Sequence, residues 1–270
     1  PSTTISGSSD SRVRVTFKSA PKVPGQSGAT YNVYRGDVTV AQVPGGFDVI
    51  NTVPLDQYLY GTVPAEMPTT WPTEALRAQA IAARSYALHE QRADAAFDVE
   101  DGTASQVYLG SLKENTASNA AVDDTTSEIL TYGGAPIVAY YHACDAGHTE
   151  DAANLFPGTT PPYLTGISDL DPAGQPYDRD CTRSHWTTKP VKRNQIEAAL
   201  GADVAAQIGT LQWLDLSARS TTGRVLTVTI GGSKGTVSMP AQQFRLLYNR
   251  SRSAALDQLL STDFDLAIVP

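Results

Sequence analysis

The sequence predicts an α+β fold. Short segments rich in β-branched and aromatic residues, bounded by Gly and Pro, lie on both sides of one long helical segment at residues 72–91. Strands and helices are interspersed without the regular alternation of a βαβ protein. We therefore expect mixed β-hairpins packed around a buried, alanine-rich helix.

The N-terminal part of the chain predicts β-structure. β-branched and aromatic residues cluster or alternate in three segments, 12–17, 30–35 and 47–52. Pro54 suits the start of a short helix over 54–64. A proline-rich loop over 66–72 follows this helix.

Residues 72–91 give the clearest helix prediction. Pro72 fits the first helical position, and Glu74 in the first turn complements the helix dipole. The segment contains six alanines, and one face carries Leu76, Ala80, Ala83 and Ala87. A helix that is small and apolar on most sides is usually buried, so any Arg or Gln buried with it must be paired.

The rest of the chain predicts hairpins and helices. A hairpin over 128–143 has its turn at Gly133-Gly134, and residues 144–190 are rich in loops. The further expected elements are a helix at 196–208, a hairpin from 224–230 and 235–240, a helix at 241–250 and a closing strand at 263–269.

Composition limits the classes of function. A net charge of -8 and a pI near 4.9 over 270 residues argue against a sequence-independent nucleic-acid binder, which is normally basic. No apolar run approaches the roughly 18–20 residues that span a bilayer. The Ser/Thr/Gly-rich residues 1–10 are expected to be a disordered N-terminal segment, and residues 11–270 one domain.

The stretch LDQYLYGTVPAEMPTTWPTEALRAQAIAARSYAL (55–88) resembles the core of the SpoIID/LytB family. That family carries Leu-x2-Tyr-Leu, then Glu-Met-Pro, Trp-Pro and an alanine-rich Arg- and Gln-containing helix. Similar segments continue downstream: SQVYLG (105–110), residues 121–150, PYLTGISD (162–169), GRVLTVTI (223–230) and QQFRLLYN (242–249). The resemblance covers about residues 50–269 and implies a catalytic domain with a core region at 50–160 and a C-terminal portion at 161–270.

The resemblance implies a peptidoglycan lytic transglycosylase that cleaves MurNAc–GlcNAc bonds of glycan strands and needs no cofactor. It implies Glu66, in Glu66-Met67-Pro68, as the single general acid/base. It also implies an extracytoplasmic setting, secreted or associated with the cell envelope, in which a cell-wall amidase is a possible partner.

The residues around Glu66 suit this chemistry. A lytic transglycosylase needs one carboxyl group, because the C6 hydroxyl of the muramic acid attacks its own C1, so the same group acts first as acid and then as base. Such an acid works best in an apolar pocket, and Pro64, Pro68 and Trp71 flank Glu66. We expect a groove at this loop.

The resemblance extends to substrate contacts. Matching helix positions are Arg77, Gln79, Arg84 and Tyr86, and further candidates are Tyr108, His142 and His148. A guanidinium binds a lactyl carboxylate bidentately, but Arg84 fits a structural role within the core equally well. Gln79 suits contact with a sugar or orientation of Glu66. Four tyrosines suit sugar stacking or the core: Tyr86, Tyr108, Tyr140 and Tyr141.

Cys144-x3-His148 and Cys181-x3-His185 have matched spacing. Two Cys and two His suit a tetrahedral zinc site, whereas an exported protein favours a Cys144–Cys181 disulfide. The disulfide is the preferred interpretation, although some members of the family that this chain resembles carry zinc near this loop. The sequence Cys144-Asp145-Ala146-Gly147 departs from the family's usual Ser-Gly-Gly here.

Two other functions remain open. One is a non-catalytic glycan-binding module that enhances a cell-wall amidase, because some members of the family that this chain resembles were first described as amidase enhancers. The other is a zinc amidase or peptidase that uses His142, His148 and a cysteine. The chain lacks H-E-x-x-H or a comparable metal-hydrolase spacing, which disfavours the latter.

Overall fold

The structure, a computed structural model, describes residues 11–17, 33–156, 158, 161–183, 186–250, 252 and 257–266. It divides the chain into two compact units, Pro1–Tyr141 and His142–Pro270. Residues 1–10, expected to be disordered, lie outside the described residues. The expected boundary at 160/161 falls within the second unit, and the extent of the catalytic domain stays a prediction.

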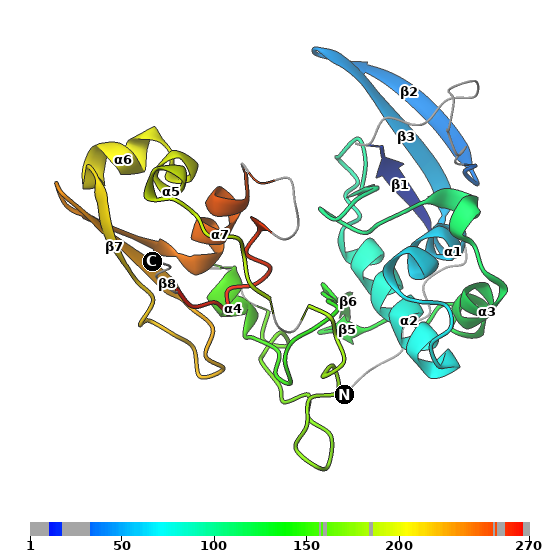
Figure 1. Ribbon diagram of the computed structural model, residues 1–270. Coiled ribbons are helices and arrows are strands. Elements are labelled where there is room, and N and C mark those ends of the chain that lie inside the picture. Colours follow the sequence, from blue (N-terminus) through cyan, green and yellow to red (C-terminus); the bar gives the residue numbers. More distant parts are fainter. Residues whose placement is uncertain are drawn as a thin grey trace. The chain divides into compact units, whose positions relative to one another are not determined.

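The first unit combines a four-stranded sheet with three α-helices (Figure 1). The sheet order is β2-β3-β1-β4, in which β1 is antiparallel to β3 and parallel to β4. The strands are β1 (Arg12–Thr16), β2 (Asp37–Val43), β3 (Gly46–Pro54) and β4 (Val99–Glu100), with a separate hairpin of β5 (Thr131–Tyr132) and β6 (Ala135–Pro136). The helices are α1 (Leu55–Glu66), α2 (Thr73–His89), the 3-10 helix η1 (Gly110–Lys113) and α3 (Thr116–Asp124).

Helix α2 forms the centre of this unit, as its composition predicts. The four residues of the predicted apolar face, Leu76, Ala80, Ala83 and Ala87, are all at most 1% exposed. Ala80, Ala83 and Ala87 pack in one core with residues of α1 and the sheet, among them Tyr58, Leu59 and Val53. Mostly small side chains on this face let α1 and α2 lie side by side (Figure 1).

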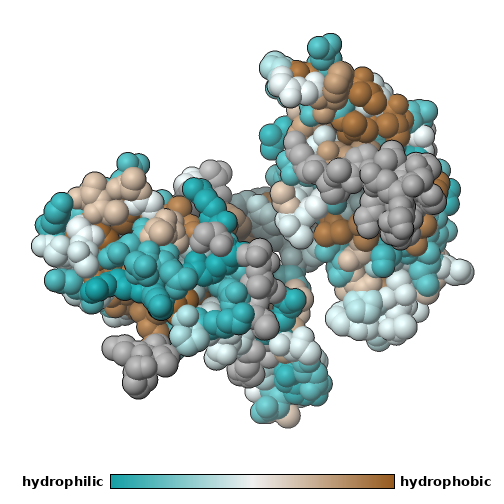
Figure 2. Space-filling model, turned by 45° about the horizontal axis from the view of Figure 1, so that its top comes forward, coloured by the Kyte–Doolittle hydropathy of each residue, from teal (hydrophilic) through white to brown (hydrophobic). Residues whose placement is uncertain are grey.

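The sheet differs from prediction at its outer edge. Residues 33–35 belong to no strand, and 30–32 lie outside the described residues. Strand β2 instead follows them and pairs antiparallel with β3 through a turn at Pro44 and Gly45, whose φ of +89° suits glycine. Hydrophobic side chains reach the surface of the molecule (Figure 2), and Val38, Val40 and Phe47 of this hairpin are more than half exposed.

The second unit packs helices against a three-stranded antiparallel sheet of order β7-β8-β9. Its elements are α4 (Ala152–Leu155), α5 (Arg193–Leu200), α6 (Ala202–Ile208), β7 (Leu211–Asp215), β8 (Thr227–Gly232), β9 (Thr236–Pro240) and α7 (Ala241–Arg250). The core contains Ile208, Val228, Ile230 and Phe244. The predicted hairpin and the predicted helix at 241–250 are confirmed.

Two predictions for the second unit are corrected. The helix expected over 196–208 is two helices, because Gly201 has a φ of +87° that no α-helix accommodates. Residues 263–266 form no strand, and 267–270, the rest of the expected closing strand, lie outside the described residues. Both units mix helices and strands, so the α+β prediction is confirmed. Within the described residues, none of the helices has the length and apolarity that crossing a bilayer demands.

Candidate functional site

Glu66 is the last residue of α1, not part of a loop as expected. The helix continues through Pro64, and its C-cap is Met67, whose backbone is extended and whose amide donates to the Val63 carbonyl at 3.0 Å. The connection to α2 is short and holds two prolines, Pro68 and Pro72, and the half-exposed Trp71. Glu66 is therefore placed on a rigid element and is half-buried.

Two groups from distant parts of the sequence lie at the Glu66 carboxylate. The backbone amide of Val107 donates to Oε1 at 2.6 Å. The hydroxyl of Tyr141 lies near this side chain, and the Glu66 carboxylate raises the pKa of Tyr141. Three segments that are distant in sequence thus meet at one carboxyl group within the first unit.

A buried chain of hydrogen bonds extends behind Tyr141. Gln106 Nε2 donates to the Tyr141 hydroxyl oxygen at 3.1 Å and lies 3.4 Å from the Ala83 carbonyl of α2. The Tyr58 hydroxyl of α1 donates to Gln106 Oε1 at 3.1 Å. Tyr58 and Gln106 are 0% exposed. This series of hydrogen-bonded side chains therefore extends from the core of the unit toward Glu66.

Both tyrosine hydroxyls of this chain keep their protons at neutral pH. Burial raises the pKa of Tyr141, and the neighbouring Glu66 carboxylate raises it further. Burial likewise raises the pKa of Tyr58 well above its ordinary value. A protonated Tyr141 that accepts from Gln106 has its own proton available for Glu66.

Arg84, expected as either a ligand or a core residue, is a core residue in this structure. It is 1% exposed, and Nε donates to Asp56 Oδ1 at 3.0 Å. Its other nitrogens donate to the carbonyls of Val122 and Glu128, both at 3.1 Å, and to Thr125 Oγ1 at 3.4 Å. These contacts favour the structural role of Arg84, and its contact with substrate stays a prediction.

The other two polar helix positions differ from Arg84. Arg77 is ion-paired at the surface, with Glu74 at 2.6 Å and Asp124 at 2.5 Å, so these carboxylates occupy the guanidinium expected to bind substrate. Gln79 is 8% exposed, and its Nε2 finds no hydrogen-bond partner among the described residues. Its predicted contact with sugar or Glu66 stays a prediction.

The aromatic candidates separate into core and half-buried residues. Tyr108 is 1% exposed, and its hydroxyl donates to Asn51 Oδ1 at 3.1 Å. Its ring offers no open face for a sugar, which corrects the expected contact. Tyr86 is half-buried, with its ring 6.2 Å from that of Tyr140, and stays a candidate.

The cysteines of the second unit form the preferred disulfide, Cys144–Cys181, with Cα atoms 6.3 Å apart. Joined sulfurs do not supply thiolate ligands, and no group of three or more metal-binding side chains occurs in the described part of the chain. His148 Nδ1 lies 2.5 Å from the Thr149 carbonyl, and His142 is exposed. His185 lies outside the described residues. The residues do not fit a zinc ion in this oxidised state.

Glu150 holds the loop that follows the disulfide. Its side chain is 6% exposed and accepts hydrogen bonds from Ser220, Thr222, Asn154 and the Asp151 amide at 2.5–3.0 Å. Burial alone raises the pKa of Glu150, but these hydrogen bonds outweigh it, and the pKa is lowered overall. A carboxylate satisfied in this way is structural.

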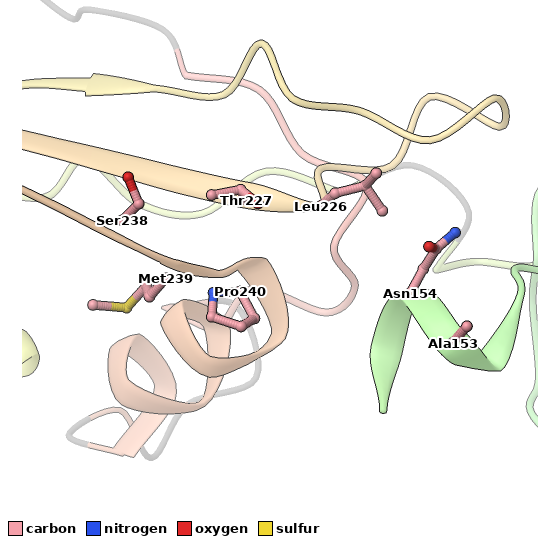
Figure 3. A pocket seen from close by; sticks show the side chains of 7 residues that line it. All are labelled: Ala153, Asn154, Leu226, Thr227, Ser238, Met239 and Pro240. Carbon is pink, nitrogen blue, oxygen red and sulfur yellow. The ribbon is translucent and has the colours of Figure 1, made fainter. Parts of the chain in front are cut away.

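The second unit also has a cavity of about 320 Å³ (Figure 3). Its lining consists of Ala153 and Asn154 of α4 with Leu226, Thr227, Ser238, Met239 and Pro240 around β8 and β9. It contains no carboxylate, histidine or other acid/base group. The candidate catalytic residue therefore lies elsewhere, in the first unit.

Gln106 and Val107 are site residues that the sequence prediction did not single out, and Tyr141 was predicted only to stack on a sugar or to lie in the core. Gln106 and Val107 belong to the SQVYLG segment that resembles the family, which was the available signal. Tyr141 is one of 12 tyrosines and carries no local signal. The Val107 contact uses the backbone amide, which any residue except proline provides.

Comparisons with known proteins show which families and relatives the chain is similar to. Residues 44–132 match the family SpoIID, stage II sporulation protein. An uncharacterised protein of Brachyspira hyodysenteriae is 40% identical over 147 residues, 53% of this chain and 40% of that protein. The amidase enhancer of Bacillus subtilis is 40% identical over 41% of this chain and 15% of its own length. Stage II sporulation protein D of Bacillus amyloliquefaciens is 28% identical over 80% of this chain and 65% of its own length. The chain spans less than two thirds of each of these relatives.

Proposed function

Since the chain belongs to the SpoIID/LytB family, we propose that it is an extracytoplasmic lytic transglycosylase acting on peptidoglycan glycan strands. Glu66 gives its proton to the oxygen that bridges MurNAc and GlcNAc, and the C1–O bond breaks. The C6 hydroxyl of the same MurNAc forms a new bond to C1 and returns its proton to Glu66, which leaves a 1,6-anhydroMurNAc end. One carboxyl group thus acts as acid and base, and no water is consumed.

One observation carries this proposal. The half-buried Glu66 at the end of α1 is held at Oε1 by the Val107 amide at 2.6 Å. A fixed carboxylate reaches a bound glycosidic oxygen without a further cost of ordering its side chain. The chemistry proposed requires no cofactor, and the disulfide removes the two cysteines from any zinc site while it is formed.

Glu66→Gln tests the function. Glutamine keeps an oxygen for the Val107 amide but has no proton to transfer. We expect the rate of strand cleavage to fall at least about a hundredfold with an unchanged unfolding temperature. The measurement is mass spectrometry of products from purified glycan strands, with and without stem peptides. The control is Glu74→Gln, which removes a carboxylate whose side chain is 81% exposed on α2; wild-type cleavage by Glu66→Gln would contradict the proposal.

The second candidate function is a glycan-binding module that enhances a cell-wall amidase. The relative named amidase enhancer, 40% identical over 111 residues, favours it. This function predicts binding to glycan strands without new anhydro ends. It also predicts that Glu66→Gln stimulates an amidase as well as the wild type does.

A further inference from the structure

The hydrogen-bonded chain behind Glu66 has a role of its own. We propose that Gln106 is a positioning residue that directs the hydroxyl proton of Tyr141 to the Glu66 carboxylate. This inference rests on the proposed function, because it assigns a task to residues behind the acid/base of that reaction.

The partners of Gln106 determine how its amide group lies. The Ala83 carbonyl, 3.4 Å from Nε2, only accepts hydrogen bonds, so the NH2 group must face it. The Tyr58 hydroxyl therefore donates to Oε1 on the other side. With this orientation Nε2 also donates to the Tyr141 hydroxyl oxygen at 3.1 Å.

The Tyr141 hydroxyl then has one direction left for its proton. Its oxygen receives a hydrogen bond from Gln106, and its neighbour on the other side is the Glu66 carboxylate, which raises the pKa of Tyr141. An ionised carboxylate only accepts, so Tyr141 is the donor in that contact. Gln106 and Tyr58 are 0% exposed, so no bulk water competes for the amide.

This arrangement acts at a defined stage of the reaction. Glu66 becomes a carboxylate once it has protonated the bridging oxygen, and it accepts from Tyr141 most strongly in that state. A hydrogen bond that strengthens as charge develops lowers the barrier without tightening substrate binding. Loss of Gln106 should therefore lower kcat and leave KM nearly unchanged.

The first experiment is a double-mutant cycle with Gln106→Leu, Tyr141→Phe and both together, assayed on purified glycan strands. We expect each single variant to lower kcat roughly tenfold, and the double variant to be no slower than Tyr141→Phe. The matched control is Tyr60→Phe, which also removes a tyrosine hydroxyl from a carboxylate, since Tyr60 donates to Asp123 at 2.5 Å. The control should keep wild-type kcat.

The second experiment guards against a simple folding defect. Gln106→Glu keeps the shape of the side chain and the acceptor for Tyr58. When ionised, the new carboxylate draws the Tyr141 proton to itself and away from Glu66; when protonated, it donates to Tyr141 as glutamine does. We expect kcat, relative to wild type at the same pH, to be low at neutral pH and to recover as the pH falls. If Gln106 were purely structural, the unfolding temperature of Gln106→Glu would recover together with kcat, because a buried charge destabilises the fold. Recovery of kcat with a constant unfolding temperature supports the positioning role.

The outcomes separate this inference from the proposed function. Glu66-dependent cleavage with wild-type kcat in folded Gln106→Leu overturns the inference alone. An equal loss from Gln106→Leu in the Tyr141→Phe background also overturns it, because Gln106 would then act by another route. Wild-type protein that forms no anhydro ends overturns the function, and the inference with it.

Discussion

Arg84 and Asp56 form a 3.0 Å ion pair in which the arginine side chain is 2% exposed and the aspartate 32% exposed. The pair joins α2 to the first turn of α1. The remaining arginine nitrogens donate to the end of α3 and the segment after it. One guanidinium therefore connects the helices that carry and surround Glu66.

Arg84→Met should destabilise the protein by about 3–5 kcal/mol, because it leaves the Val122 and Glu128 carbonyls and Asp56 without their buried partner. Urea unfolding measures this loss. Arg77→Met is the control and should cost much less, since Arg77 pairs at the surface. Unchanged stability with weaker glycan binding in Arg84→Met would restore the ligand interpretation.

The disulfide gives a second prediction. Replacing both Cys144 and Cys181 by serine should destabilise the protein by about 3–4 kcal/mol, in a model where the bridge restricts the unfolded chain. Wild-type protein should lose the same stability in reductant, whereas the double variant should be insensitive to it. Adding Zn²⁺ to reduced wild type tests the alternative: a recovery of stability absent from the double variant would show that the thiols bind metal.

The carboxyl group of Glu150 predicts a pH dependence of stability. Its folded-state pKa lies below the ordinary 4.5, so its contribution to stability is complete above that pH and is lost as the pH falls through the folded pKa. Unfolding free energies from neutral pH down to about pH 3 should fall more steeply for wild type than for Glu150→Gln. Thr222→Val removes one donor to Glu150 and should reduce the steepness. Equal slopes in wild type and Glu150→Gln would contradict the prediction.

The features that could be predicted are those in which local and long-range preferences agree. Helix α2 is such a case, because alanine content, capping and the apolar face through Leu76 and Ala87 all favour one buried helix. The burial of this helix also predicts that a buried Arg84 must be paired. Its partner Asp56 could not be predicted, because nothing local relates positions on two helices.

The features that were missed depend on single residues or on distant contacts. Gly201 separates two helices, although the apolar pattern continues across it, so the pattern alone predicted one helix. Strand β2 was missed although Val38 and Val40 alternate before the turn at Gly45. Gln106 and Tyr141 reach Glu66 only through tertiary packing, for which sequence spacing holds no information.

The placement of Val107 and Tyr141 around the end of α1 has a consequence for when the protein becomes competent. Neither donor is near Glu66 until the chain up to Tyr141 has collapsed onto the first two helices. A nascent, nicked or partly unfolded molecule would carry the acid without its supports. If the proposed function holds, such a molecule would not cleave glycan strands, so activity would depend on the folding of the first unit.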